Sequence, residues 1–256
     1  MTRRLLSAAA PLLLIVALLA IWEVACRALH IPEYLLPTPS AVAAALWENA
    51  WPLAISAGRT LAMALEALVA AALFAWTLAL AVSVSRTLDR AVRPLAVGLQ
   101  VTPVVAIAPL FVIWAGVDHP GRAIIALAAI VAFFPIFSGT VRGLASPDLD
   151  LERLFDLYGA NPAQKLLRLR LPSALPFIVE GAKVASGLAI IGAVVAEFVA
   201  GSGGAQGLAW RILEAGNRLQ TAKMFAAILA LAVMAAGVNL VFQALERRAL
   251  RWWRGR

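Results

Sequence analysis

Six apolar stretches run along the chain, and most of the charged residues lie between them. A helix needs about 20 residues to cross a hydrocarbon core ~30 Å thick. Stretches long enough to do so occur at about residues 8–28, 58–84, 95–116, 122–143, 176–200 and 224–245. They are continuous and rich in Ala and Leu, without the alternation of a transmembrane β-strand. The pattern therefore predicts an all-α, polytopic membrane protein with about six spans.

The composition agrees with this prediction. Of the 256 residues, 62% are hydrophobic and 14% are charged, whereas a soluble domain carries about 25% charged residues. We see no repeat of 20–50 residues and no low-complexity linker, so we expect a single transmembrane domain over residues 1–256. Cys26 is the only cysteine, which excludes an internal disulfide and a cysteine cluster.

The N-terminus has a second interpretation. Arg3 and Arg4 precede an apolar run, as in a signal peptide. The sequence Val24-Ala25-Cys26 also resembles a lipoprotein cleavage site, but Glu23 stands three residues before Cys26, where such sites carry an apolar residue. We therefore favour an uncleaved first span.

Basic residues predict the orientation. In a six-span arrangement, 15 of the 22 Lys and Arg residues fall on one side: Arg3, Arg4, Arg86, Arg90, Arg93, Arg142, Arg153, Lys165, Arg168, Arg170, Arg247, Arg248, Arg251, Arg254 and Arg256. Loops rich in Lys and Arg stay in the cytoplasm. Both termini and the segment 144–175 should therefore be cytoplasmic. The net charge of +8 fits this orientation and contact with anionic lipid, and it requires no nucleic-acid partner.

The segment 144–175 is the longest strongly charged stretch, and its first half predicts a short amphipathic helix. Asp148 or Asp150 is a suitable N-cap. Apolar residues then recur at i, i+3, i+4 and i+7, namely Leu151, Leu154, Phe155 and Tyr158. Gly159 follows, and glycine ends a helix in the left-handed conformation without steric cost.

The second half predicts another short helix. Asn161 is a good N-cap, Pro162 suits the first helical position, and Gln164 completes a capping box. Lys165, Arg168 and Arg170 make this helix basic. Pro172 should end it, because proline lacks an N–H and restricts the residue before it.

A pair of interfacial helices lying on lipid is one explanation of this segment. The basic second helix fits that explanation. The first helix does not, because its four carboxylates would face anionic lipid: Asp148, Asp150, Glu152 and Asp156. A docking surface for a soluble partner fits both helices.

The spacing in this segment resembles the cytoplasmic signature of permease subunits of bacterial ATP-binding-cassette importers. That signature reads Glu-Ala-Ala, three residues, Gly, nine residues, Ile, any residue, Leu-Pro. Gly159 is followed by nine residues and then by Leu169-Arg170-Leu171-Pro172. Arg153, Leu154 and Phe155 depart from Glu-Ala-Ala, and Glu152 lies one position away from the family's Glu. The departure leaves open which acidic residue contacts the ATPase.

The resemblance covers about residues 35–250 and is closest to the nitrate, sulfonate and taurine branch. It is carried by the motifs Leu36-Pro37-Thr38-Pro39, Arg93-Pro94, Thr102-Pro103, Ala106-Ile107-Ala108-Pro109-Leu110, Phe133-Phe134-Pro135-Ile136 and Val194-Val195-Ala196-Glu197-Phe198, and by the Gly-rich residues 201–207. The branch carries nitrate, sulfonates, taurine and related compounds, including uncharged heterocycles.

The resemblance implies a membrane-spanning subunit of the bacterial inner membrane that forms the pathway for such a nutrient. Its expected partners are a second copy of the chain, cytoplasmic ATP-binding subunits, and a periplasmic or lipid-anchored substrate-binding protein. The loop 144–175, called the coupling loop below, would dock on the ATPase. The residues implied in coupling are Glu152, Arg153, Asp156, Gly159, Ala160, Leu169, Leu171 and Pro172.

Ionisable residues within the spans need a partner or water, because each costs ~2.5–3.5 kcal/mol at a span centre. Glu180 and Lys183 lie near the start of the fifth span, where snorkelling or mutual i,i+3 pairing explains them. Glu197, at the outer end of that span, is a candidate gate or a simple interface residue. Ser186 and Gly192 belong to a row of small residues that either packs helices closely or lines the pathway.

Two other classes of membrane protein fit the sequence less well. A proton-coupled secondary transporter would use Glu66 and Glu197 as carriers, but the chain lacks an inverted repeat. A membrane-embedded enzyme would need a catalytic constellation within the spans, and we find none. The chain also lacks a phosphate-binding Gly-rich loop, so it should not hydrolyse ATP itself. We predict no catalytic residue, metal site or cofactor.

Overall fold

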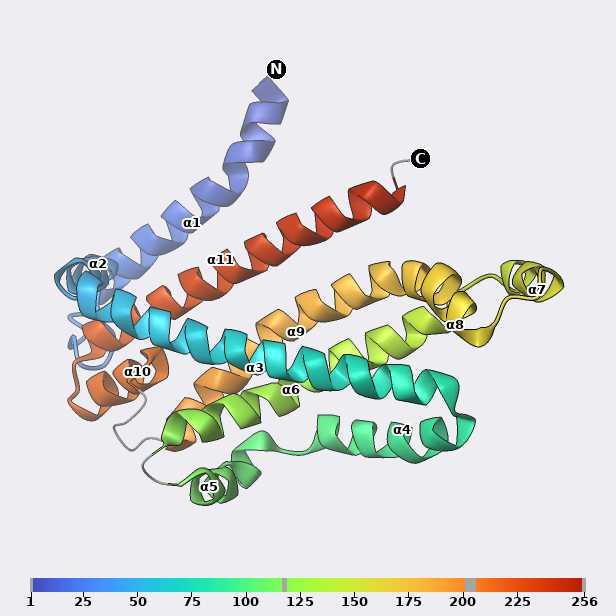
Figure 1. Cartoon of the computed structure of the whole chain (residues 1–256). Helices are drawn as coiled ribbons and strands as arrows, with labels where there is room; N and C mark the ends of the chain where they lie inside the picture. Colours follow the sequence, from blue (N-terminus) through green and yellow to red (C-terminus); the bar gives the residue numbers. More distant parts are fainter. Residues whose placement is uncertain (1, 117–118, 201–205, 255–256) are drawn as a thin grey trace. The chain divides into compact units, whose positions relative to one another are not determined.

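The computed structural model describes residues 2–116, 119–200 and 206–254; among these, the side chains of residues 2–9, 11, 12, 252 and 254 are not described. Every regular element in these ranges is a helix (Figure 1), which confirms the all-α prediction. The elements are α1 (Thr2–Ala28), α2 (Pro39–Glu48), α3 (Ala50–Val84), α4 (Arg86–Val101), α5 (Val104–Ala115), α6 (Pro120–Leu144), α7 (Leu149–Leu157), α8 (Pro162–Lys165), the π-helix η1 (Leu166–Arg170), α9 (Leu171–Ala200), α10 (Leu208–Asn217) and α11 (Thr221–Arg254).

Within the described residues, four helical segments are long and apolar enough to cross a membrane. They are Ala50–Val84, Pro120–Leu144, Pro162–Ala200 and Thr221–Arg251, and they confirm the predicted second, fourth, fifth and sixth spans. The predicted first span coincides with α1, which is not among these four segments, so this span stays a prediction.

The third predicted span, 95–116, is not one continuous helix. It consists of α4 and α5, which meet at a bend of 99°. The break falls at Thr102-Pro103, where Thr102 is extended with ψ 125°. A proline lacks an N–H and disfavours helical geometry in the residue before it, so the cause of the bend is local. The pair is either one broken span or a re-entrant segment.

The described chain forms two compact units. Unit 1 comprises Met1–Ala57 and Gln206–Ala232, and unit 2 comprises Gly58–Ala205 and Val233–Arg256. The long helices α3 and α11 each contribute one part to unit 1 and the other part to unit 2.

Unit 2 is built on the close contact of α6 with α9. A Cβ added to Gly181 of α9 would lie 2.7 Å from the carbonyl oxygen of Pro135, and one added to Gly139 of α6 would lie 2.8 Å from that of Phe177. These distances are shorter than real Cβ contacts, so the two backbones approach at positions that only glycine permits. The small side chains at Ala71, Ala75 and Ala79 of α3 bury a face in the same core.

Unit 1 joins α1, α2 and α10 with the starts of α3 and α11. The Glu23 carboxylate accepts hydrogen bonds from the backbone N–H (3.0 Å) and the hydroxyl (2.8 Å) of Ser40, which fastens α1 to α2. The Thr221 hydroxyl donates to the Tyr34 carbonyl oxygen at 2.7 Å, linking the start of α11 to the turn before α2. These hydrogen bonds link elements of unit 1 that are distant in the sequence, beside buried apolar residues such as Val42, Leu53 and Leu208.

Candidate functional site

The coupling loop begins with α7, whose ends are set by local chemistry. Asp148 caps it by accepting a hydrogen bond from the Asp150 N–H at 3.0 Å. The helix closes with Gly159, whose φ is +66°, and with the Ala160 N–H donating to the Phe155 carbonyl oxygen at 2.9 Å. The predicted cap and the left-handed glycine are both confirmed.

The second helix starts as its sequence predicts. The Asn161 side chain accepts from the Gln164 N–H at 2.8 Å, and the Gln164 side chain accepts from the Asn161 N–H at 2.9 Å. This is a complete capping box, with Pro162 at the first helical position. Two orphan donors at the start of the helix are thereby satisfied.

The predicted end of this helix at Pro172 is wrong. The chain stays helical from Pro162 to Ala200, and the segment Leu166–Arg170 adopts a π-helix. There the Leu171 N–H donates to the Leu166 carbonyl oxygen, five residues back. The wider π turn accommodates Pro172, whose missing N–H and bulky ring would otherwise disturb the preceding α-helical turn. The coupling loop therefore joins the fifth span without a break.

Two ion pairs connect α7 to the helix that follows. Arg170 donates to one Glu152 oxygen from both Nε (3.1 Å) and Nη2 (2.9 Å), and Lys165 pairs with Asp156. Glu152 and Asp156 are one turn apart on α7, so the pairs act on the same face. Both acidic residues that the sequence suggested for contact with an ATPase are thus engaged within the loop.

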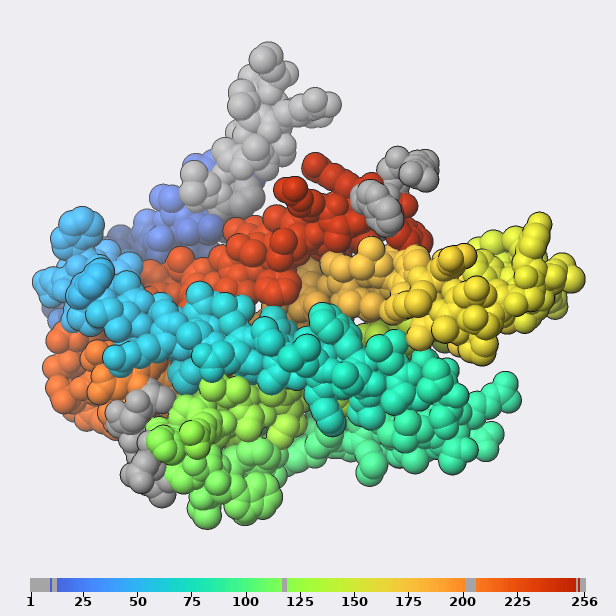
Figure 2. All heavy atoms as spheres, viewed as in Figure 1, coloured from blue at the N-terminus to red at the C-terminus, as the bar shows by residue number. Residues whose placement is uncertain are grey.

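The apolar face of α7 is open. No residue of α7 is buried, and its exposed apolar side chains are Leu149, Leu151, Leu154 and Leu157, with Tyr158 directly after them. Phe155 is half-buried. Figure 2 shows this segment in yellow at one end of unit 2. Among the signature residues, Leu169 is buried and Leu171 is half-buried, so these two side chains pack inward.

A hollow of about 460 Å³ lies beside the coupling loop within unit 2. Its charged lining comes from the corner between α3 and α4 and from the loop itself: Arg86, Asp89, Arg93, Glu152 and Arg170. Arg93 pairs with Asp89 at 2.8 Å, as Arg170 pairs with Glu152. The first turns of α4 therefore form one wall of the groove along the loop.

Glu197 is the most deeply buried carboxylate of α9, with 2% of its surface exposed. It accepts a hydrogen bond from the Thr60 hydroxyl of α3 at 3.3 Å, and Thr60 is itself fully buried. Residues 201–205 of the glycine-rich segment 201–207 expected beside it lie outside the described residues. The observed role of Glu197 is to connect α9 to α3 through a buried polar contact.

The other two candidate pathway residues face packed surroundings. A Cβ on Gly192 would lie 2.8 Å from the Ala128 Cα of α6. Ser186 is buried and donates to the Lys183 carbonyl oxygen of its own helix at 2.7 Å. A role of either residue in the pathway stays a prediction.

Lys183 pairs with a residue that the sequence did not suggest. Its ammonium lies 2.9 Å from the Glu246 carboxylate of α11, and Glu180 is exposed. Of the two explanations, snorkelling and an i,i+3 pair of Glu180 with Lys183, the pair is not formed, and Lys183 instead connects α9 to α11. Among the residues that the structure describes, no cluster of His, Cys, Asp or Glu has a composition suited to a metal ion.

The sequence is similar to those of known membrane transport proteins. Residues 68–251 match the family of binding-protein-dependent transport system inner membrane components. The riboflavin transport system permease protein RibX of Chloroflexus aurantiacus is 35% identical, over 92% of this chain and 87% of that protein. The formylaminopyrimidine transport permease protein ThiX of Halalkalibacterium halodurans is 32% identical, over 98% of both chains. The taurine transport system permease protein TauC of Escherichia coli is 32% identical over 59% of this chain and 53% of TauC.

These findings separate the chain from the proton-coupled transporter and the membrane-embedded enzyme. Its family implies separate ATP-binding subunits and a substrate-binding protein, and the apolar helices agree with a multi-pass inner-membrane protein. The chain belongs to the binding-protein-dependent transport system inner membrane component family and is the non-catalytic permease subunit of an ATP-binding-cassette transporter.

Proposed function

We propose that this permease subunit receives the force of ATP hydrolysis through its coupling loop, residues 144–175. The single observation that carries this proposal is the open apolar face of α7 beside the signature residue Gly159. Leu157 alone is 86% exposed. An apolar helix face of this kind, positioned outside the predicted spans, suits a groove on a soluble partner.

The contact with the ATPase is mainly apolar in this proposal. Glu152 and Asp156 are occupied by Arg170 and Lys165, so their contribution is to fix the angle between α7 and the next helix. Arg153 pairs with Asp150 on the exposed surface and remains accessible to a partner. The carboxylates thus position the surface, and the leucines make the contact.

The unbroken helix from Pro162 to Ala200 gives a direct path for the movement. A displacement of α7 acts on α8 through Lys165 and on η1 through Arg170, and then on α9 through the continuous backbone. Because α9 is packed against α6 at glycine positions, both helices would move together as the spans alternate between inward- and outward-open states.

Orientation and assembly complete the proposal. Both termini and the coupling loop lie in the cytoplasm, and two copies of the chain form the pathway. The 15 basic residues on one side support the orientation. The substrate is a small nutrient, either an anion such as a sulfonate or taurine or a related compound. The relatives RibX, ThiX and TauC are named for three different substrates, which agrees with specificity set chiefly by the binding protein.

Glu197 is proposed as a gate residue at the outer end of α9. It is buried against Thr60 of α3, so a change in its contacts alters how these two helices meet. Glu197→Ala should impair uptake while the complex still assembles, and Glu197→Gln, which keeps an oxygen acceptor for Thr60, should retain more activity. Normal uptake by Glu197→Ala would leave Glu197 as an interface residue.

One labelling experiment tests orientation and docking together. A cysteine replaces Leu157 in a chain that carries Cys26→Ser, and Leu35→Cys, which is also exposed, serves as the matched control. In intact cells an impermeant thiol reagent should label position 35 and not position 157. In inside-out vesicles it should label position 157, and added ATP-binding subunits should protect that position. Labelling of position 157 in intact cells contradicts the orientation, and labelling that the ATP-binding subunits leave unchanged contradicts docking on α7.

A further inference from the structure

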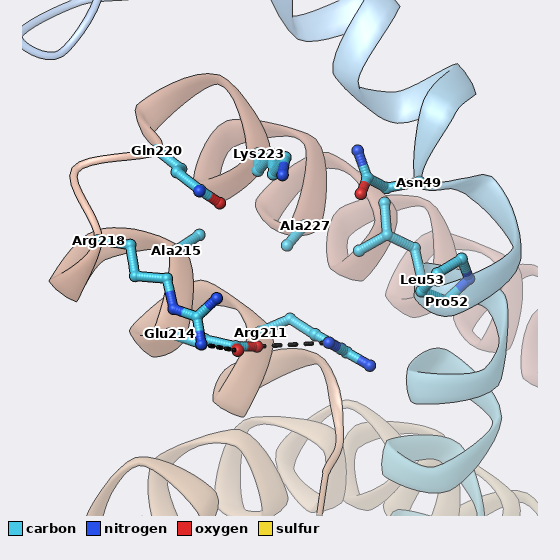
Figure 3. Close-up of a pocket in the computed structure, with 10 residues that line it drawn as sticks. All are labelled: Asn49, Pro52, Leu53, Arg211, Glu214, Ala215, Arg218, Gln220, Lys223 and Ala227. Carbon is cyan, nitrogen blue, oxygen red and sulfur yellow. Dashed lines mark hydrogen bonds and ion pairs between the residues drawn. The ribbon is translucent and has the colours of Figure 1, made fainter.

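Unit 1 contains a cavity of about 140 Å³ that the coupling proposal does not use (Figure 3). It is bounded by α10, by the start of α11 and by the start of α3. Its polar lining consists of Asn49, Arg211, Glu214, Arg218, Gln220 and Lys223. The volume is roughly ten times the minimum that holds one water molecule, so a small polar group fits.

The cavity carries three cations and one carboxylate. Glu214 pairs with Arg211 at 3.3 Å and with Arg218 at 3.0 Å. Lys223 has no ion-pair or hydrogen-bond partner among the described residues, and it lies across the cavity from Glu214 in Figure 3. The lining thus keeps an excess of positive charge that its own acid does not neutralise.

The cations of α10 are positioned before any ligand arrives. Arg211 donates from Nε to the Ser56 hydroxyl at 3.2 Å, and Ser56 is buried. Glu214 joins Arg211 to Arg218. Side chains that are already ordered lose little entropy when they bind a ligand. This ordering applies most to Arg211, since Arg218 is 65% exposed.

The turn between α10 and α11, which contributes Arg218 and Gln220 to the lining, has a strained backbone. Leu219 has φ +55°, a conformation that glycine or asparagine adopts more readily. Its side chain is exposed, so packing does not explain the leucine. The turn sets Arg218 and Gln220 on either side of Leu219, and both line the cavity. Backbone strain of this kind is found at binding sites and persists because the surroundings hold it.

Lys223 also stands where a cation is disfavoured. It lies in the first turn of α11, which contains no acidic residue. The start of a helix carries partial positive charge, so it weakly disfavours this exposed lysine, and an anion bound nearby would be attracted to both. The same positive helix terminus adds to the attraction for an anion at this rim of the cavity.

We propose that this cavity binds one oxyanion group, a carboxylate or a sulfonate. Lys223 makes the charged contact, Arg218 provides its remaining N–H donors, and the side-chain amides of Asn49 and Gln220 donate to the oxygens. In the proposed orientation, α10 and the start of α11 face the outside. The oxyanion is then supplied either by a free anionic nutrient or by an acidic side chain of the substrate-binding protein. Contact with the substrate-binding protein rests on the proposed orientation, whereas binding of a free anion does not.

The test uses the assembled transporter in lipid nanodiscs at low ionic strength. Binding of sulfate is measured by calorimetry, and docking of the cognate substrate-binding protein is measured by surface plasmon resonance. Lys223→Gln removes the charge, and Lys223→Arg keeps it. Arg27→Gln is the matched control, because Arg27 is an exposed cation of unit 1 that does not line the cavity.

We expect Lys223→Gln to weaken one of the two interactions about tenfold, the effect of losing one hydrogen bond to a charged group. Lys223→Arg should restore it, and Arg27→Gln should change neither. Weaker sulfate binding identifies a free anion as the source, and weaker docking alone identifies a carboxylate of the partner. If Lys223→Gln changes neither interaction, or if Arg27→Gln has the same effect, the site is overturned. Retention of the ATP-binding subunits by every variant keeps this result separate from the coupling proposal.

Discussion

The contact between α6 and α9 and the surface of α7 belong to the same unit, yet one is closed and the other is open. At Gly181 and Gly139 the backbones of α9 and α6 come so close that an added Cβ would meet a carbonyl oxygen. On α7, in contrast, no residue is buried, and the leucines face outward. The difference shows that apolar residues have two roles in this unit. Small residues join helices permanently, and large exposed ones on a short charged helix leave a surface for a partner.

The largest expected effect comes from disturbing the closed contact. Gly181→Ala places a Cβ 2.7 Å from the Pro135 carbonyl oxygen, and overpacking of this kind costs about 1–3 kcal/mol. We expect lower accumulation in the membrane and a lower unfolding temperature of the purified subunit. The matched control is Gly187→Ala, on the same helix, where the new Cβ meets nothing within 4 Å. That variant should be as stable as the parent or more so, since alanine favours a helix over glycine by about 0.5–1 kcal/mol. Equal stability of the two variants would contradict the close α6–α9 contact.

A smaller effect on stability, but a large one on assembly, is expected at Gly159. A Cβ there meets no atom within 4 Å, so Gly159→Val acts only through the left-handed backbone, at about 1–2 kcal/mol. The subunit should still insert and accumulate, while co-purification of the ATP-binding subunits and substrate-stimulated ATP hydrolysis are lost. Gly159→Asn, which tolerates positive φ, should keep both. A Gly159→Val complex that purifies intact with normal coupled hydrolysis would show that the angle at this turn is unimportant.

The smallest effect concerns the ion pair that positions α7. In a double-mutant cycle with Glu152→Gln and Arg170→Gln, measured as the affinity for the ATP-binding subunit, we expect a coupling energy of about 0.2–1 kcal/mol. The side chains are 28% and 34% exposed, respectively, so solvent screens the pair only in part. The Asp150–Arg153 pair, at 84% and 76% exposure, is the control and should show no measurable coupling. Equal coupling energies in the two cycles would contradict the proposal that the Glu152–Arg170 pair positions α7.

The sequence predicted those features that local chemistry determines. The spans at α3, α6, α9 and α11 follow from continuous apolar runs, and the capping box follows from Asn161 and Gln164, whose side chains each accept from the other's backbone N–H. The positive φ of Gly159 follows from the residue type at the end of a short helix. Each of these depends on neighbours within one or two helical turns.

Features that depend on distant residues or on competing local signals were missed. Lys183 pairs with Glu246, 63 residues away, and nothing in its own neighbourhood favours that partner over Glu180. Pro103 bends the third span, whereas Pro135 and Pro176 remain inside helices. The residue type alone therefore does not decide between a bend and a tolerated proline. The cavity of unit 1 joins α3, α10 and α11, so only folding reveals that Asn49 and Lys223 share a site.

The π-helix at Leu166–Arg170 matters for how α9 is rotated about its own axis. A π turn holds one residue more than an α turn, and each residue of an α-helix corresponds to about 100° of rotation. The π turn therefore takes up one extra residue for nearly the same rotation. Removal of that residue would leave an α-helix in nearly the same phase, whereas removal of a residue from the α-helical part between Pro172 and Gly181 would turn Gly181 about a quarter of a revolution away from α6. The π turn thus lets nine residues fit between Gly159 and Leu169 without changing which face of α9 meets α6.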